Sequence, residues 1–129
     1  MQIVINTQKA VYALLSENLE LEIYDFVPEN AALPYITIGD AALAKKPALG
    51  KNIYEVDIRL HAYGAAKGRK DLLELGQEIF DLLDSQFLDI EDFEHFEHYE
   101  TLLIDQTADL IEGGEKYELT DSYRIIIGE

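Results

Sequence analysis

Two prolines, Pro28 and Pro34, interrupt a β-rich stretch near the start of the sequence. Each proline fixes its own φ angle and disfavours helical geometry in the residue before it. The runs on either side, residues 19–27 and 35–39, are rich in β-branched, aromatic and other apolar residues, which favour strands. This part of the chain is therefore predicted to fold as strand, loop, strand, with residues 29–33 exposed in the loop.

Apolar residues at helical spacing predict two helices. The first covers residues 7–18, where Asn6 or Thr7 can cap the start and Asn18 can end the helix. The second covers residues 70–86 and carries the clearer apolar stripe. The predicted buried faces comprise Ala10, Val11, Leu14 and Leu15 in the first helix, and Leu72, Leu75, Ile79, Leu82 and Leu83, widened by Leu73 and Phe80, in the second.

Alternation of apolar and polar residues predicts three further strands. The clearest covers residues 52–63, and residues 95–110 and 117–128 would form a hairpin around Glu112-Gly113-Gly114-Glu115. The inward faces would be Tyr54, Val56, Ile58, Leu60 and Ala62 in the first of these strands, and Leu119, Tyr123, Ile125 and Ile127 in the last. In the middle one, Thr101, Leu103 and Asp105 would share one face, and Leu102, Ile104 and Gln106 the other.

Residues 41–51 are small and basic and contain Pro47 and Gly50, so we expect a mobile loop there. The resulting order, α-β-β-β-α-β-β, predicts an α+β fold: a mostly antiparallel β-sheet packed on one face by two helices. With 129 residues, the chain is expected to form a single domain over residues 1–129.

Several classes of protein are disfavoured by composition. The chain has no cysteine, which excludes a disulfide framework and a thiolate metal site. No apolar run approaches the roughly 18 residues of a membrane span, and the start of the sequence lacks the features of a signal peptide. We therefore expect a protein that is made in the cytoplasm and has no membrane partner.

The charge is uneven along the chain. Residues 1–70 carry eight acidic and eight basic side chains, whereas residues 71–129 carry eighteen acidic and two basic ones, Lys116 and Arg124. The whole net charge of −16 therefore lies in the second segment. Such a surface repels phosphate backbones, which argues against nucleic-acid binding through counterion release. Plain solubility is the simplest interpretation of this acidity.

Residues 23–42 read IYDFVPENAALPYITIGDAA. This segment resembles one in the tail-completion (tail-terminator, head–tail joining) proteins of long-tailed bacteriophages, where the pattern is roughly (I/V)YD.VP..A.LPY(I/V).(I/L)GD. The matching residues are Ile23, Tyr24, Asp25, Val27, Pro28, Ala31 or Ala32, Leu33, Pro34, Tyr35, Ile36, Ile38, Gly39 and Asp40. The resemblance continues through residues 57–64, DIRLHAYG, and the helix after them, and ends more loosely with SYRIIIGE, so it covers most of the chain.

The resemblance implies a structural virion protein at the tail–head interface, made in the bacterial host, without catalysis or cofactors. It implies a homo-oligomeric ring, hexameric when assembled, with a monomer as an alternative for the free protein. The implied partners are the tail tube protein and the head-closure protein. DNA would pass through the ring without specific binding, and an acidic lining would let it slide.

The proposed partner-binding residues fall into two groups. Glu29 and Asn30 lie at the tip of the predicted loop, which Tyr24-Asp25 and Leu33-Pro34-Tyr35 would hold rigid. Asp25 would accept hydrogen bonds from backbone N–H groups of residues 29–32, and Tyr35 would pack its ring on the sheet and leave its hydroxyl a partner. The second group is basic and would meet the acidic surface of a neighbouring identical subunit, with a solvated face as the simpler reading: Lys45, Lys46, Lys51, Lys67, Arg69 and Lys70.

Other patterns give weaker signals. His95 and His98 have a spacing that could hold a metal on a helix, but two solvated histidines with pKa values raised by nearby carboxylates are the simpler interpretation. An apolar series at every third residue suggests a core edge or a partner-binding stripe: Phe87, Ile90, Phe93, Phe96 and Tyr99. No metal ligands and no catalytic residues are therefore predicted. The alternative function is a small α+β adaptor that binds a ligand or a protein.

Overall fold

The computed structural model describes residues 2–48, 50–65, 68–85, 88, 97–110 and 116–128. It contains two helices, α1 (Gln2–Asn18) and α2 (Arg69–Ser85), and five strands in one sheet. The strands are β1 (Glu22–Tyr24), β2 (Tyr35–Ala48), β3 (Lys51–Ala65), β4 (Glu97–Leu110) and β5 (Lys116–Gly128). This order of elements confirms the predicted α-β-β-β-α-β-β arrangement.

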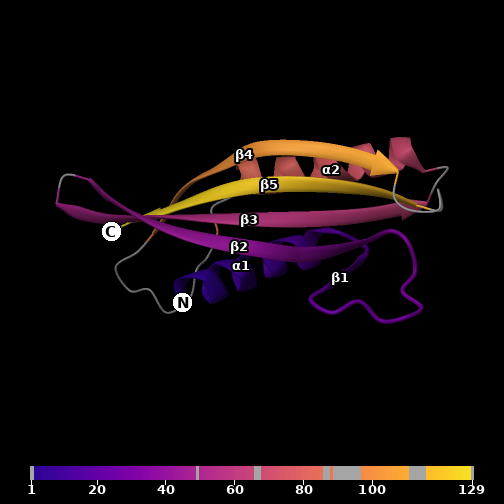
Figure 1. Cartoon of the computed structure of the whole chain (residues 1–129), viewed down its shortest axis with the longest axis horizontal. Coiled ribbons are helices and arrows are strands. Elements are labelled where there is room, and N and C mark those ends of the chain that lie inside the picture. The colour runs from indigo at the N-terminus through magenta and orange to yellow at the C-terminus, as the bar shows by residue number, and fades with distance from the viewer. Residues whose placement is uncertain are drawn as a thin grey trace.

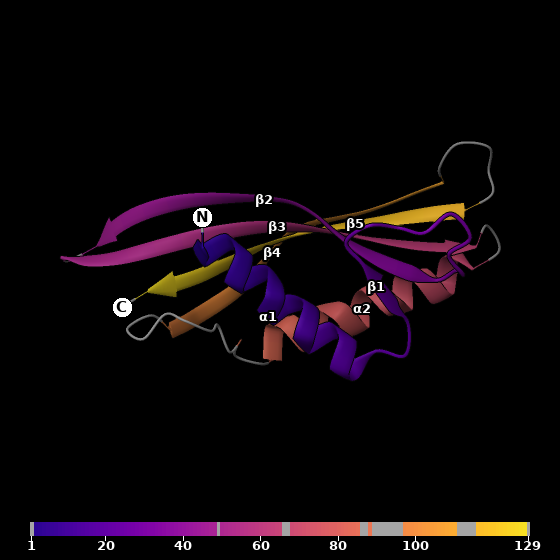
Figure 2. The ribbon, with the colours of Figure 1, turned by 90° about the horizontal axis from the view of Figure 1, so that it is seen from below.

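The sheet has the strand order β1-β2-β3-β5-β4. β1 runs parallel to β2, and the other neighbouring pairs are antiparallel. Both helices cover the same face of the sheet, and no helix in the described part of the chain lies on the opposite face (Figures 1 and 2). The α+β prediction is therefore confirmed, with β3 and β5 as the central strands.

The core lies between the helices and this covered face. Alternate residues of β3 and β5 are buried, from Val56 to Ala62 and from Leu119 to Ile127, as the sequence pattern predicted. The helices contribute Ala10, Val11 and Leu15 from α1, and Leu72, Leu75, Ile79 and Leu83 from α2. Leu73 does not widen the α2 stripe, because 39% of its surface is exposed.

The first helix begins earlier than predicted, so neither Asn6 nor Thr7 caps it. Both side chains are buried within α1. The Thr7 hydroxyl donates to the Ile3 carbonyl oxygen at 2.6 Å, and the Asn6 side-chain oxygen accepts from Gln2 at 2.7 Å. These bonds to the preceding turn let polar residues sit inside a helix. Asn18 does end the helix, and its amide donates to the Leu14 carbonyl oxygen at 2.7 Å.

The prediction of a loop over residues 41–51 is wrong, because β2 continues to Ala48 and pairs with β3 along this length. A bulge between Ile38 and Ala41 shifts the register and hides the alternation in the sequence. β1 pairs only with Tyr35–Thr37 of β2, so the rest of β2 is an edge strand. Pro47 is tolerated there because an edge strand needs backbone donors on one side only.

Two other strands also differ from their predictions. The strand expected over residues 19–27 contains only Glu22–Tyr24, because the chain then leaves the sheet, with Asp25 and Phe26 exposed. In β4, a register shift between Leu103 and Asp105 changes the faces. Asp105 therefore pairs with Ser122 on the open face, and Gln106 pairs with the inward-facing Asp121.

Candidate functional site

The open face of the sheet is the side opposite α1 and α2, and it carries mostly polar side chains. Residues paired across neighbouring strands point to the same face, so the register places half-buried and exposed residues of β3 and β5 together there. Its central members are Glu55, Asp57, Arg59, His61 and Tyr63 from β3, and Glu118, Thr120, Ser122 and Arg124 from β5. The central part of this face is therefore polar and partly exposed to solvent.

Three tyrosines support the strand ends on this face. The ring of Tyr35 is buried and lies 5.0 Å from that of Tyr63 and 5.6 Å from that of Tyr24, between ring centres. The ammonium of Lys116 lies 5.9 Å and 5.2 Å from the ring centres of Tyr35 and Tyr63, within the range of cation–π attraction. It also donates a hydrogen bond to the Tyr35 hydroxyl at 3.5 Å. The prediction for Tyr35, a packed ring with a partner for its hydroxyl, is therefore confirmed.

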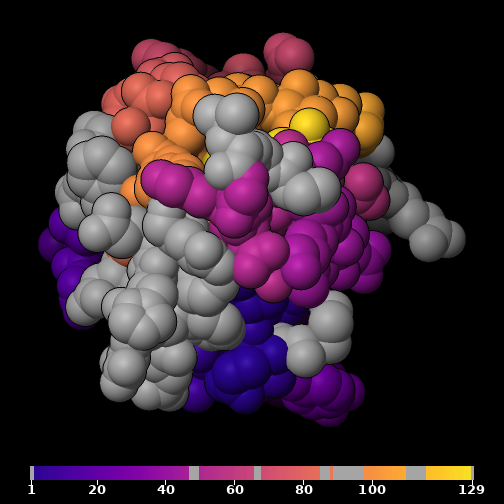
Figure 3. Space-filling model, turned by 90° about the vertical axis from the view of Figure 1, so that its left-hand side faces the viewer, coloured from indigo at the N-terminus to yellow at the C-terminus, as the bar shows by residue number. Residues whose placement is uncertain are grey.

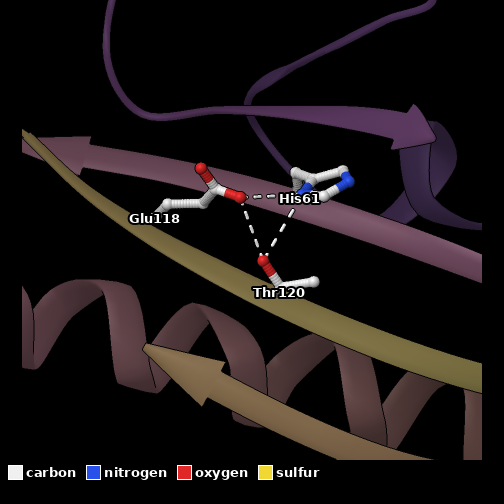
Figure 4. Close-up of polar contacts among 3 residues, drawn as sticks. All are labelled: His61, Glu118 and Thr120. Carbon is white, nitrogen blue, oxygen red and sulfur yellow. Dashed lines mark hydrogen bonds and ion pairs between the residues drawn. The ribbon is translucent and has the colours of Figure 1, made fainter. Parts of the chain in front are cut away.

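His61 links β3 to β5 through a small polar network (Figure 4). Its Nδ1–H donates to the Glu118 carboxylate at 3.0 Å, and Thr120 donates to the same oxygen at 3.0 Å. In a serine–histidine–aspartate triad, the acid and the hydroxyl bind opposite ring nitrogens. Here both groups lie at Nδ1, while Nε2 lies beside Gly39 of β2. The network therefore joins strands and lacks the geometry of nucleophilic catalysis.

A second cross-strand pair lies further along the same face. Arg124 Nε and Nη2 donate to the two carboxylate oxygens of its register partner Asp57, at 2.9 Å and 3.1 Å. Glu55 adds a longer ion pair at 3.5 Å. The hydrogen bond and the charge of Asp57 raise the pKa of Arg124. Arg124, one of the two basic residues after residue 70, therefore forms its ion pairs with Asp57 and Glu55 of the same subunit.

The loop between β1 and β2 projects from the sheet. Glu29 and Asn30 are exposed, as predicted, and Phe26 is 88% exposed, which sequence reasoning missed. The predicted role of Asp25 as acceptor for this turn is wrong. Its side chain is exposed, and the Ala31 N–H donates instead to the Pro28 carbonyl oxygen at 3.2 Å. The Leu33–Pro34 peptide bond, just before β2, is cis.

The predicted basic residues do not form a single patch. Lys45, Lys46 and Lys51 lie exposed at the turn end of the β2–β3 hairpin, whereas Arg69 and Lys70 begin α2. The 15-residue strand β3, which is about 45 Å long at about 3.3 Å per residue, lies between these groups. Figure 3 looks onto the end of the molecule at which the hairpin turns. Lys67 lies outside the described residues.

His98 is buried, so the prediction of two solvated histidines is wrong for this residue. Its Nδ1 accepts a hydrogen bond from the Leu88 N–H at 2.9 Å, which places the proton on Nε2, 2.7 Å from the Thr101 hydroxyl oxygen. Burial lowers the pKa of His98. His95 lies outside the described residues, among which no group of His, Asp and Glu side chains is arranged to hold a metal ion.

Tyr99 is the described member of the predicted apolar series, and it is 40% exposed. The other four members, Phe87, Ile90, Phe93 and Phe96, lie outside the described residues. A different apolar run is visible on the edge strand β4, where Leu102, Leu103 and Ile104 are each 38–46% exposed beside the register shift.

An open groove of about 920 Å³ lies on the helix side of the sheet. Its walls come from the end of α1, the residues around β1, the chain before β2, the end of β3 and the first turns of α2. Leu19, Ile23, Leu72 and Leu75 give it an apolar floor. No helix in the described part of the chain is long and apolar enough to cross a membrane.

Comparison with known proteins gives matches to a protein family and to solved structures. The family model "Tail completion protein gp17" matches residues 4–116. A chain of the solved structure "Virion of native gene transfer agent (GTA) particle" is similar with a TM-score of 0.84 and 14% identity, over 98% of each chain. At this identity, the likeness shows a shared fold. No curated protein matches the sequence.

Proposed function

Because the chain belongs to the tail completion protein gp17 family, we propose that it forms a hexameric ring that caps the tail tube and joins the tail to the head. Membership of this family confirms the resemblance found in the sequence and makes the chain a structural protein of the virion. The match over residues 4–116 is the observation that carries the proposal. The fold shared with a chain of a phage-like particle supports it.

The structure has a packed sheet and an exposed loop, and this combination suits such a role. The packed tyrosines and the ion pairs hold the sheet of one subunit together, while the loop between β1 and β2 presents Phe26, Glu29 and Asn30 to the outside. A rigid support with exposed tips favours docking, because little conformational freedom is lost on binding. We assign this loop to contact with the tail tube protein or the head-closure protein.

The acidic second segment fits the passage of DNA. Its carboxylates include exposed residues of α2 and β4, such as Glu74, Asp81, Asp84, Glu100 and Asp109. A channel lined by such groups would repel the phosphate backbone and let DNA slide. The ring would then have two kinds of surface: the loops between β1 and β2, which bind partner proteins, and an acidic channel lining, which does not bind DNA.

Negative-stain microscopy of the protein mixed with its tail tubes tests the proposal. We expect rings at one end of the tubes, and tubes that join to heads when heads are added. Tubes that stay bare at both ends in saturating protein would overturn it.

A loop variant locates the docking surface. Glu29→Ala with Asn30→Ala should leave the melting temperature unchanged and reduce the joining of tails to heads. Lys9→Ala, on the exposed surface of α1, is the matched control and should join normally. Normal joining by the folded loop variant would place the docking surface elsewhere.

A further inference from the structure

The groove on the helix side has a mixed chemical character that points to its occupant. Above its apolar floor, four exposed carboxylates line the walls: Glu20, Glu22, Asp71 and Glu78. Among the described residues that line it, none is basic. A segment that combines small apolar residues with positive charge would therefore complement this groove.

The chain itself contains such a segment at the turn end of the β2–β3 hairpin, which we call the arm. The arm, residues 44–51, reads AKKPALGK and carries a net charge of +3 with no acidic residue. Lys45, Lys46 and Lys51 are exposed, and pairing of β2 with β3 as far as Ala48 and Lys51 keeps the arm extended. Gly50 has a positive φ angle of 76°, which favours glycine at the turn.

The arm cannot enter the groove of its own subunit. Gly64 and Ala65, at the far end of β3, line the groove, whereas Lys51 begins that strand. The two sites are thus separated by the length of β3, about 45 Å at about 3.3 Å per residue. Contact between them has to be made between two copies of the chain.

We propose that the arm of one subunit seats in the groove of the next, with its lysines against the four carboxylates. Such a contact joins different surfaces of two identical subunits, so repetition of the contact generates a ring when the rotation closes. This inference rests on the proposed ring and names the surfaces that would form it. It also gives a role to the extended end of β2, which lies beyond its pairing with β1.

Site-directed cross-linking tests the contact, because the chain has no cysteine of its own. One variant carries Lys46→Cys in the arm, and a differently tagged variant carries Glu78→Cys in the groove. Mixed at high protein concentration and treated with a short bismaleimide, the pair should give at least about tenfold more mixed dimer than the control. The control pairs Lys9→Cys with the same groove variant, since Lys9 is exposed on α1 and lies outside the groove.

Charge reversal gives an independent readout in analytical ultracentrifugation. Lys45→Glu with Lys46→Glu should weaken self-association, and so should Glu20→Lys with Glu78→Lys. A mixture of the two variants should recover mixed oligomers, because it pairs a reversed arm with a reversed groove. The association of the original chain should also weaken as salt shortens the Debye length from about 10 Å to about 3 Å.

The outcomes separate the two proposals. If the protein self-associates but the cross-linked pair gives no more mixed dimer than the control, the arm does not bind in the groove. The ring proposal is unaffected by this result, and the groove would then bind another ligand or protein. Absence of oligomers at any concentration, both in the free protein and on tail tubes, overturns both. Self-association that strengthens with salt shows an apolar contact and also overturns the arm proposal.

Discussion

Gly76 of α2 lies so close to β5 that a methyl group in place of its hydrogen would be 2.5 Å from the Cδ2 atom of Leu119. The same methyl group would be 2.9 Å from the Gln106 side-chain nitrogen of β4. Both distances are shorter than contacts between packed atoms, and Leu119 is buried. The helix can therefore approach the sheet at this point because residue 76 has no side chain.

Gly76→Ala should therefore destabilise the protein. Overpacking a core costs about 1–3 kcal/mol, which exceeds the roughly 1 kcal/mol that alanine gains over glycine within a helix. Urea unfolding measures the difference, and Gln77→Ala on the exposed side of α2 is the control, expected within about 0.5 kcal/mol of the original chain. A Gly76→Ala variant that is more stable than the original chain would show that α2 is free to move away from the sheet.

Asp121→Asn should change how stability depends on pH. Burial, more than the neighbouring Asp105, raises the pKa of Asp121 to about 6, and the side chain of Gln106 partly offsets this effect. Because the folded-state pKa lies above the unfolded value, this carboxyl loses stability as pH rises from about 4 through about 6. Asparagine has no proton to lose, so the variant should gain roughly 2–3 kcal/mol relative to the original chain across that window.

Urea unfolding of both proteins at pH 4 and pH 7 gives this difference. The neighbouring carboxylates are the same in both proteins, so their contributions to the pH dependence of stability largely cancel. They are Asp105 near Asp121, and Asp81 and Asp84 near Tyr123. Equal pH dependence in the two proteins would mean that Asp121 stays ionised and hydrated.

His98 should remain neutral, with its proton on Nε2, at pH 6.5. The Leu88 N–H donates to Nδ1, and burial lowers the pKa of the ring. Since the folded-state pKa lies below the unfolded value, the unfolded chain binds the proton first, and the contribution of His98 to stability falls as pH drops below about 6.5. Nitrogen-15 NMR of the imidazole reports both the tautomer and the titration. A proton on Nδ1, or half-protonation above pH 6.5, would contradict the observed hydrogen bonds.

The elements that the sequence predicts well are those whose burial is one-sided. In β3, the residues from Val56 to Ala62 alternate strictly because one face packs on the helices. The second half of β2 is not predicted from the sequence. It is an edge strand, and it contains alanines, lysines and Pro47, which do not form an alternating strand pattern. The pairing of this half of β2 with β3 is seen in the structure, but it cannot be deduced from the residues of β2 alone.

The candidate site is predictable to a smaller extent, for related reasons. Exposure of Glu29 and Asn30 follows from the two prolines around them. The burial of His98 depends on Leu88 and Thr101, which a spacing between two histidines cannot reveal. The separation of the basic residues depends on β3 lying between them, and the groove depends on five segments that meet only after folding.

The last prediction separates support from contact in the loop between β1 and β2. Tyr35→Ala removes a buried ring that packs on Tyr24 and Tyr63, and it should cost about 3–5 kcal/mol. Phe26→Ser changes a side chain that is 88% exposed, so stability should change by less than about 0.5 kcal/mol while the joining of tails to heads falls. Thermal melts beside an in vitro joining assay distinguish the two effects. If the Phe26→Ser protein folds and joins tails as well as the original chain, this exposed ring is no docking contact and Glu29 and Asn30 have to carry the recognition alone.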